Sequence, residues 1–158
     1  LAILKAGTVE KQEPFAAVLS CADSRVRVEL VFDQSIGHLF VTRVAGNMVT
    51  PEIIGSLEYG VAVLGVKAIL VLGHAKCGAV SAAMKGQEVP GQISVLYQHM
   101  MPAIEHIHDV SAAVKANAVF QARLLGESST VIAKAMEEDG VKVVAGYYDL
   151  GSGRVTLL

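Results

Sequence analysis

The sequence predicts an α/β domain with a mainly parallel central β-sheet that is flanked by helices. Three observations predict this fold: short runs of residues are apolar throughout, helical stretches separate them, and two of the runs end in polar, reactive side chains. A strand that is apolar on both faces must be covered on both faces, which parallel strands joined by helices achieve. At 158 residues the chain is expected to form a single catalytic domain over residues 1–158.

The strands are predicted from apolar runs of strand length. The first run, FAAVLSC, is followed by others of similar length and character. A last short strand is expected after the turn LGSG. The predicted strands span residues 15–21, 39–44, 68–73, 141–147 and 154–157.

The helices are predicted from their start and stop signals. Thr50, Pro51 and Glu52 are an N-cap, a proline at the first helical position and an acidic first turn, so a helix should extend to about residue 64. Further helices are expected over residues 78–85 and, as one or two helices, within 93–126. Ser129 is expected to cap a helix over 130–139 that ends at Gly140.

The composition is apolar for a soluble monomer. Hydrophobic residues make up 53%, charged residues 18%, and mean hydropathy is +0.50, which fits either a membrane protein or a chain that buries surface in an oligomer. The longest apolar stretch, residues 61–73, is interrupted by Lys67 and is shorter than the roughly 20 residues of a membrane span. We therefore expect a homo-oligomer, a dimer or tetramer, and no membrane association.

Charge and cysteine content exclude other classes. The net charge is −2, and no basic patch carries interleaved aromatic residues, so no nucleic-acid partner is expected. Two cysteines are too few for a secreted disulfide framework, and residues 1–4 do not resemble a signal peptide. We expect a cytoplasmic location or another reducing compartment, such as an organelle or microcompartment.

Two polar motifs follow predicted strands, at the carboxyl edge of the sheet where α/β proteins bind their ligands. The first is CADSR, which begins at Cys21, and the second is GHAKCG, which carries His74 and Cys77. One imidazole and two thiolates form a known catalytic Zn²⁺ ligand set that leaves a fourth position for water. Taken singly, each cysteine could be a small buried hydrophobe, or the two could form a disulfide. Together, the three residues predict one Zn²⁺ per chain.

Asp23 and Arg25 are expected to form a pair beside this metal. Arg25 can hold the carboxylate in a bidentate fork, which keeps Asp23 ionised and able only to accept hydrogen bonds. Such a carboxylate would accept a hydrogen bond from a zinc-bound hydroxide and so orient the lone pair of its oxygen toward the substrate. The alternative is a plain structural ion pair at a strand end.

The motifs resemble those of the β-class carbonic anhydrases. Cys-x-Asp-Ser-Arg followed by His-x-x-Cys is specific in this order, and the likeness extends from about Gln12 to the C-terminus through FVTRVAGNMV and SLEYGVAVLGVKAILVLGH. The resemblance implies a zinc lyase, a carbonate dehydratase, that hydrates CO₂ reversibly to bicarbonate and a proton. It also implies that Cys21, His74 and Cys77 bind Zn²⁺ and that Asp23 and Arg25 are the catalytic dyad.

The resemblance assigns further residues to substrate binding. Gln12 matches a glutamine that donates a hydrogen bond to substrate or bicarbonate, and the backbone N–H of Gly78 matches a second donor. Phe40, Ala45 and Tyr59 match positions that line a narrow apolar pocket, some of them across a dimer interface. Without the resemblance, Phe40 and Tyr59 are core aromatic residues and Gln12 is a solvated loop residue.

The resemblance also bears on regulation and assembly. One subgroup uses a tryptophan three residues before the first cysteine, together with an arginine that matches Arg43, to bind inhibitory bicarbonate. That position here is Val18, and the chain has no tryptophan, so we expect the form without this regulation. Family members also usually carry N-terminal helices that embrace the partner subunit, and this arm is expected to be absent here.

Two alternatives to CO₂ hydration remain open at this point. A hydrolase of carbonyl sulfide or carbon disulfide would use the same zinc chemistry, and only the shape and access of the pocket would differ. A non-catalytic zinc-binding module would need a fourth protein ligand, which an intact Asp23–Arg25 pair does not favour. A dinucleotide-binding enzyme with the same ligand set is not expected, because no G-x-G-x-x-G motif follows a strand.

Overall fold

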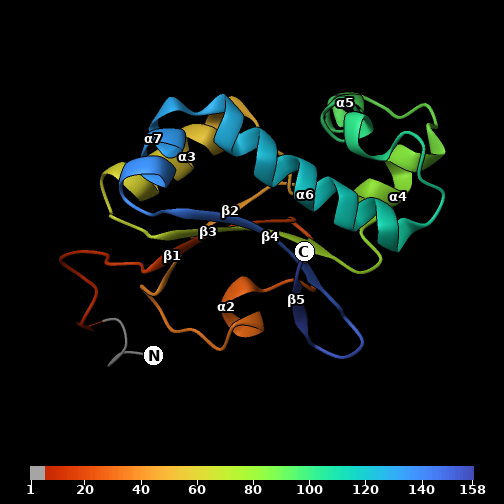
Figure 1. Cartoon of the computed structure of the whole chain (residues 1–158). Coiled ribbons are helices and arrows are strands. Elements are labelled where there is room, and N and C mark those ends of the chain that lie inside the picture. Colours follow the sequence, from red (N-terminus) through yellow and green to blue (C-terminus); the bar gives the residue numbers. More distant parts are fainter. Residues whose placement is uncertain (1–5) are drawn as a thin grey trace.

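Within residues 6–158, the central sheet contains five strands in the order β2-β1-β3-β4-β5 (Figure 1). The computed structural model describes residues 6–158. The pairs β1–β2, β1–β3 and β3–β4 are parallel, and β5 pairs antiparallel with β4. This arrangement confirms the predicted mainly parallel sheet. The strands are β1 (Ala16–Ser20), β2 (Leu39–Arg43), β3 (Ala68–His74), β4 (Lys142–Tyr148) and β5 (Val155–Leu157).

The helices cover the two faces of the sheet unequally (Figure 1). One face carries α3 (Pro51–Ala62), α6 (Val110–Ser128) and α7 (Thr130–Glu138), whereas the opposite face carries the single turn α2 (Val28–Val31). Helices α4 (Gly78–Lys85) and α5 (Ile93–Ile104) lie beyond the carboxyl ends of the strands. The sequence did not predict α2, because one helical turn leaves little periodicity to detect.

The predicted helix boundaries agree with the capping contacts. Thr50 Oγ1 accepts a hydrogen bond from the backbone N–H of Ile53, at 3.4 Å, and begins α3. Ser129 Oγ accepts from Ile132 N at 3.0 Å and begins α7, and Gly140 follows its end with φ +70°. The stretch 93–126 contains two helices, α5 and most of α6. The side chains that begin α3 and α7 each therefore satisfy a backbone donor that would otherwise lack a partner.

In the described part of the chain, the core consists of three packed clusters of buried residues. The largest lies between the sheet and helices α3, α6 and α7 and includes Leu19, Leu57 and Ile69. A second cluster joins α4, α5 and α6 and includes Cys21 and Cys77. A third lies on the face covered by α2. The two cysteines are thus part of a packed core, which fixes their side chains.

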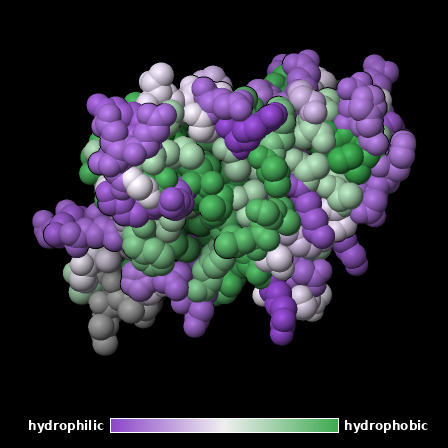
Figure 2. Space-filling view, in the orientation of Figure 1, coloured by the Kyte–Doolittle hydropathy of each residue, from purple (hydrophilic) through white to green (hydrophobic). Residues whose placement is uncertain are grey.

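The surface exposes several large hydrophobic side chains. Figure 2 shows hydrophobic residues gathered across the middle of one face. Between α6, α7 and β4, a groove of about 570 Å³ includes Val119, Met136 and Leu158 in its lining. No helix within residues 6–158 has the length and apolar character needed to span a bilayer.

Candidate metal centre

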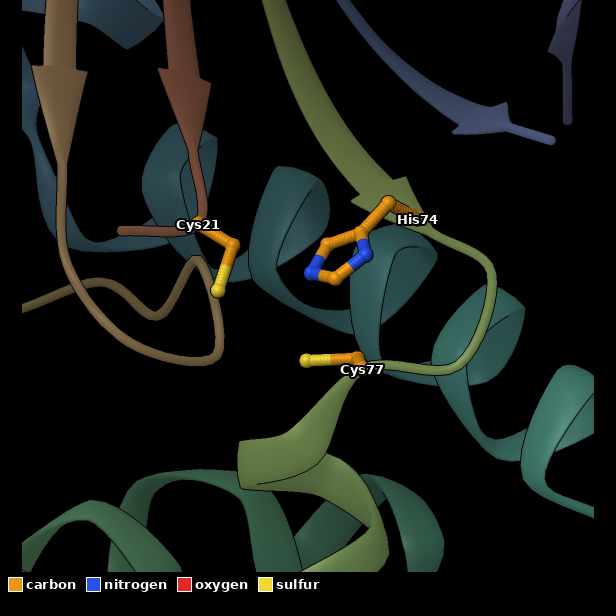
Figure 3. Close-up of side chains that lie close together, drawn as sticks. All are labelled: Cys21, His74 and Cys77. Carbon is orange, nitrogen blue, oxygen red and sulfur yellow. The ribbon is translucent and has the colours of Figure 1, made fainter. Parts of the chain in front are cut away.

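Cys21, His74 and Cys77 converge at the carboxyl edge of the sheet, as the sequence predicted. Cys21 directly follows β1, His74 is the last residue of the neighbouring β3, and Cys77 is the N-cap of α4. Their potential ligand atoms all lie within 4.8 Å of one another, and all three residues are buried. Figure 3 shows the two thiols and the imidazole pointing toward a common space.

One ring nitrogen of His74 is positioned to bind a metal ion. Nδ1 lies 2.9 Å from the carbonyl oxygen of Ala75, and because that oxygen can only accept, Nδ1 carries the proton and donates it. Nε2 is therefore the basic nitrogen. It is buried without a hydrogen-bond partner, a costly state for a polar atom unless it has a ligand.

The two thiols are coupled to each other. The hydrogen bond with Cys77, together with the one from the Gly46 N–H, lowers the pKa of Cys21 to about 4. The same bond, followed by burial, raises the pKa of Cys77, although the backbone N–H groups of Val80 and Ala79 at the start of α4 lower it. Two adjacent thiolates repel each other, so a bound cation would favour the ionisation of both sulfurs.

These observations fit Zn²⁺. A tetrahedral zinc ion with Zn–S of about 2.3 Å and Zn–N of about 2.0 Å needs ligand atoms roughly 3.5–3.8 Å apart, which the observed cluster can supply. Two thiolates would neutralise the charge of the ion. No other cluster of three or more histidine, cysteine, aspartate or glutamate side chains with this geometry occurs within residues 6–158.

Asp23 lies beside the centre and is held by Arg25. Oδ1 accepts hydrogen bonds from Arg25 N and Nε, both at 2.9 Å, and Oδ2 accepts from Arg25 Nη2 at 2.7 Å. The hydrogen bonds from the Arg25 side chain are the main reason that the pKa of Asp23 lies well below its usual range. Oδ2 is 3.8 Å from His74 Nε2, so an ionised carboxylate borders the space that the three ligands enclose.

Two residues contact the centre in ways that sequence reasoning did not assign. Arg43 donates from Nε to the carbonyl oxygen of Cys21 at 2.9 Å and from Nη2 to that of Asp23 at 2.6 Å, and so fixes the backbone of the CADSR loop. The backbone N–H of Gly46 donates to Cys21 Sγ at 3.4 Å. For the second contact, the only signal in the sequence was the glycine itself, which can bring its backbone close to another group.

The residues expected to bind substrate fall into two groups. Ala45 precedes Gly46 in the loop over Cys21, and Gly78 is the first residue of α4, so both lie next to the metal ligands. Phe40 pairs with Ala17, four residues before Cys21, and is therefore about 13 Å from it along the strand direction.

Tyr59 and Gln12 also lie outside the immediate centre of their own protomer. The Tyr59 ring is 6.3 Å from the Phe40 ring, and its side chain is partly exposed on α3. Gln12 is exposed and precedes β1, whereas Cys21 follows the same strand. These residues do not join the three ligands within one chain.

Comparisons with known proteins agree with this geometry. A sequence model of the carbonic anhydrase family matches residues 16–155. The carbonic anhydrase of Mycolicibacterium smegmatis is 37% identical, with 97% of this chain and 79% of that protein covered. Carbonic anhydrase 2 of Mycobacterium tuberculosis is 32% identical, with 97% and 78% covered.

Solved structures show the same fold. A β-carbonic anhydrase of Aspergillus fumigatus has a TM-score of 0.89 and 26% identity, with 99% of this chain and 81% of that chain covered. One of two tetrameric β-carbonic anhydrases of Sordaria macrospora has a TM-score of 0.90 and 24% identity, with 98% and 85% covered. The family match over most of the sequence, and relatives above 30% identity over nearly its full length, show that this chain belongs to the β-class carbonic anhydrases, lyases that are also called carbonate dehydratases.

Proposed function

We propose that this protein catalyses the reversible hydration of CO₂ to bicarbonate and a proton, with Zn²⁺ held by Cys21, His74 and Cys77 and with Asp23 and Arg25 as the catalytic dyad. The observation that carries the proposal is the environment of His74 Nε2. This buried atom has no partner, faces two thiols, and has an ionised carboxylate oxygen 3.8 Å away. A structural zinc site would instead present a fourth protein ligand.

The chemistry that Zn²⁺ supplies when bound is the acidification of a water molecule, which provides hydroxide as a nucleophile near neutral pH. Asp23 orients that nucleophile. Three hydrogen bonds from Arg25 occupy most of the acceptor capacity of the carboxylate, and the capacity that remains is on Oδ2, the oxygen nearest the ligands. Because Asp23 stays ionised, Oδ2 can only accept a hydrogen bond, so it would fix the orientation of a hydroxyl group placed beside it.

The loop and helix around the ligands suit a small neutral substrate and an anionic product. Ala45 directly precedes Gly46, whose N–H contacts Cys21, so a small apolar residue lies in the loop next to the ligands. Gly78 begins α4, where backbone N–H groups that lack helical partners carry partial positive charge and favour bicarbonate. CO₂ would thus contact the apolar residue Ala45, and bicarbonate would contact the N–H groups at the start of α4.

We also infer that the active protein is a homo-oligomer. Phe40, Tyr59 and Gln12 lie too far from the ligands of their own chain to line its pocket, so they can act in substrate binding only at the site of a second copy. The apolar composition and exposed hydrophobic surface support association. We also propose a cytoplasmic or other reducing location, because two cysteines are too few for a secreted disulfide framework.

The direct test is stopped-flow CO₂ hydration on protein of measured zinc content, with carbonyl sulfide assayed in parallel. We expect CO₂ hydration that scales with zinc occupancy and little turnover of carbonyl sulfide. Zinc-loaded protein that hydrates no CO₂ would refute the proposal, and faster turnover of carbonyl sulfide would reassign the substrate.

Assembly is tested separately by sedimentation equilibrium at micromolar concentration. We expect a dimer or tetramer. Gln12→Ala should lower kcat/KM without changing zinc content, whereas Lys11→Ala, at an exposed neighbouring position, should change neither. A purely 16.6 kDa species with full activity would contradict the assembly.

A further inference from the structure

The loop between β2 and α3 reaches over the Cys21 thiol in a conformation that only a few residues allow. Gly46 has φ +82° and Asn47 has φ +42°, so two successive residues are left-handed. A Cβ atom on Gly46 would collide with Sδ of Met100 and lie 3.2 Å from its Cε. The loop is therefore pressed between Cys21 and Met100, with the Gly46 N–H directed at Cys21 Sγ.

Two buried amides on α6 hold this loop at both ends. Asn117 Nδ2 donates to the carbonyl oxygen of Gly46 at 2.9 Å. Gln121 Oε1 accepts from the backbone N–H of Val49 at 2.8 Å. Gln121 Nε2 donates to Asn117 Oδ1 at 3.1 Å and to the carbonyl oxygen of His99 at 2.9 Å. Both side chains are completely buried, so no water competes for these bonds.

The donor and acceptor roles in this network leave no alternative arrangement. The Val49 N–H can only donate, so the oxygen of Gln121 must face it and the amide nitrogen must face Asn117. Asn117 therefore presents its oxygen to Gln121 and its nitrogen to the Gly46 carbonyl. The bond from Gln121 to His99, the residue before Met100, also fixes the part of α5 that presses on Gly46.

We propose that Asn117 and Gln121 are positioning residues for the metal centre. They hold the loop so that the Gly46 N–H stays aligned with the Cys21 thiolate. The inference rests on the proposed zinc site and extends it to two residues that touch neither metal ligand nor substrate. A hydrogen bond to a ligating thiolate withdraws negative charge from the sulfur and fixes its orientation, and losing partners of metal ligands typically weakens metal binding by 10- to 100-fold.

The first test compares Asn117→Leu and Gln121→Met with Leu125→Ala. The first two substitutions keep side-chain volume and remove the amides. Leu125 is a fully buried residue of the same helix without a role in the network, so its variant controls for loss of stability alone. Zinc affinity is measured by chelator competition, and the thiolate-to-metal charge-transfer band is recorded on Co²⁺-loaded protein.

We expect zinc affinity to fall by about 10- to 100-fold in the amide variants. Their charge-transfer band should move to lower energy, because a sulfur without its hydrogen bond gives up an electron more easily. Leu125→Ala should keep the wild-type band and affinity. Amide variants that fold and match the wild type in both measurements would overturn the proposal.

A second test uses only wild-type protein, so it can be carried out even if the variants do not fold. In wild-type protein loaded with ¹¹³Cd, the Gly46 amide proton should show scalar coupling to cadmium through Cys21 Sγ, and absence of this coupling would overturn the proposal. Neither test measures turnover. A protein that binds metal but hydrates no CO₂ would refute the proposed function alone, and one that binds no metal would refute both.

Discussion

Replacing Asp23 with asparagine isolates the part of the mechanism that depends on an acceptor beside the metal. An asparagine has one oxygen, and that oxygen can take the place of Oδ1, where two Arg25 donors converge. Its NH₂ group then occupies the position of Oδ2, where it faces Arg25 Nη2 as donor against donor. The group 3.8 Å from His74 Nε2 thus changes from an obligate acceptor to a donor.

The expected loss is large in catalysis and small in stability. A reactive group that is no longer oriented costs about 10²-fold or more in rate, which corresponds to about 2.7 kcal/mol of transition-state stabilisation at 1.36 kcal/mol per decade. The Arg25 side chain is 51% exposed, and an ion pair with an exposed partner contributes only about 0–1 kcal/mol to folding. Asp23→Asn should therefore keep its fold and its zinc.

The assay is stopped-flow CO₂ hydration, with zinc content and thermal unfolding measured on the same samples. Asp33→Asn is the matched control, because Asp33 is an exposed carboxylate with φ +50°, a conformation that asparagine also tolerates. The control should match the wild type in all three measurements. Wild-type kcat/KM in Asp23→Asn, or a loss explained wholly by missing zinc, would refute the role of this carboxylate.

Three other predictions follow from the same geometry. Cys77→Ser should lose most of its zinc, because a hydroxyl is a weaker ligand than a thiolate. Zinc content is measured by metal analysis after dialysis, and full occupancy would show that the ligand assignment is wrong. Hydrogen bonds lower the pKa of Asp23, so its stabilising contribution is fully present above about pH 4 and is lost only as pH falls through its lower folded value. The pH profile of CO₂ hydration should therefore be smooth, and a steep cooperative loss on mild acidification would indicate that Asp23 leaves its arginine. Gly46→Ala should lower the free energy of unfolding by about 1–3 kcal/mol in urea titrations, because of its positive φ and its contact with Met100. The control is Gly55→Ala, where a Cβ meets nothing within 4 Å; equal stability of the two variants would contradict this account.

The amino-acid sequence alone determined the features that depend on neighbours in the chain. Apolar runs of strand length located the parallel strands, and Thr50 and Ser129 marked helix starts through bonds to residues three positions away. The ligand set was predictable for a related reason. Cys21 and His74 each lie at the end of a strand, and parallel strands deliver their carboxyl ends to the same edge.

Only the tertiary structure decided which distant groups complete the centre. Nothing in the sequence near Asn117 and Gln121 indicates that their amides hold a loop 71 and 72 residues earlier in the chain. The same is true of Phe40, whose distance from the ligands of its own chain follows from strand register. Hydrogen bonds between buried groups depend on how helices pack on the sheet. Packing brings together residues that are far apart in the chain and have no regular spacing from which the contact could be predicted.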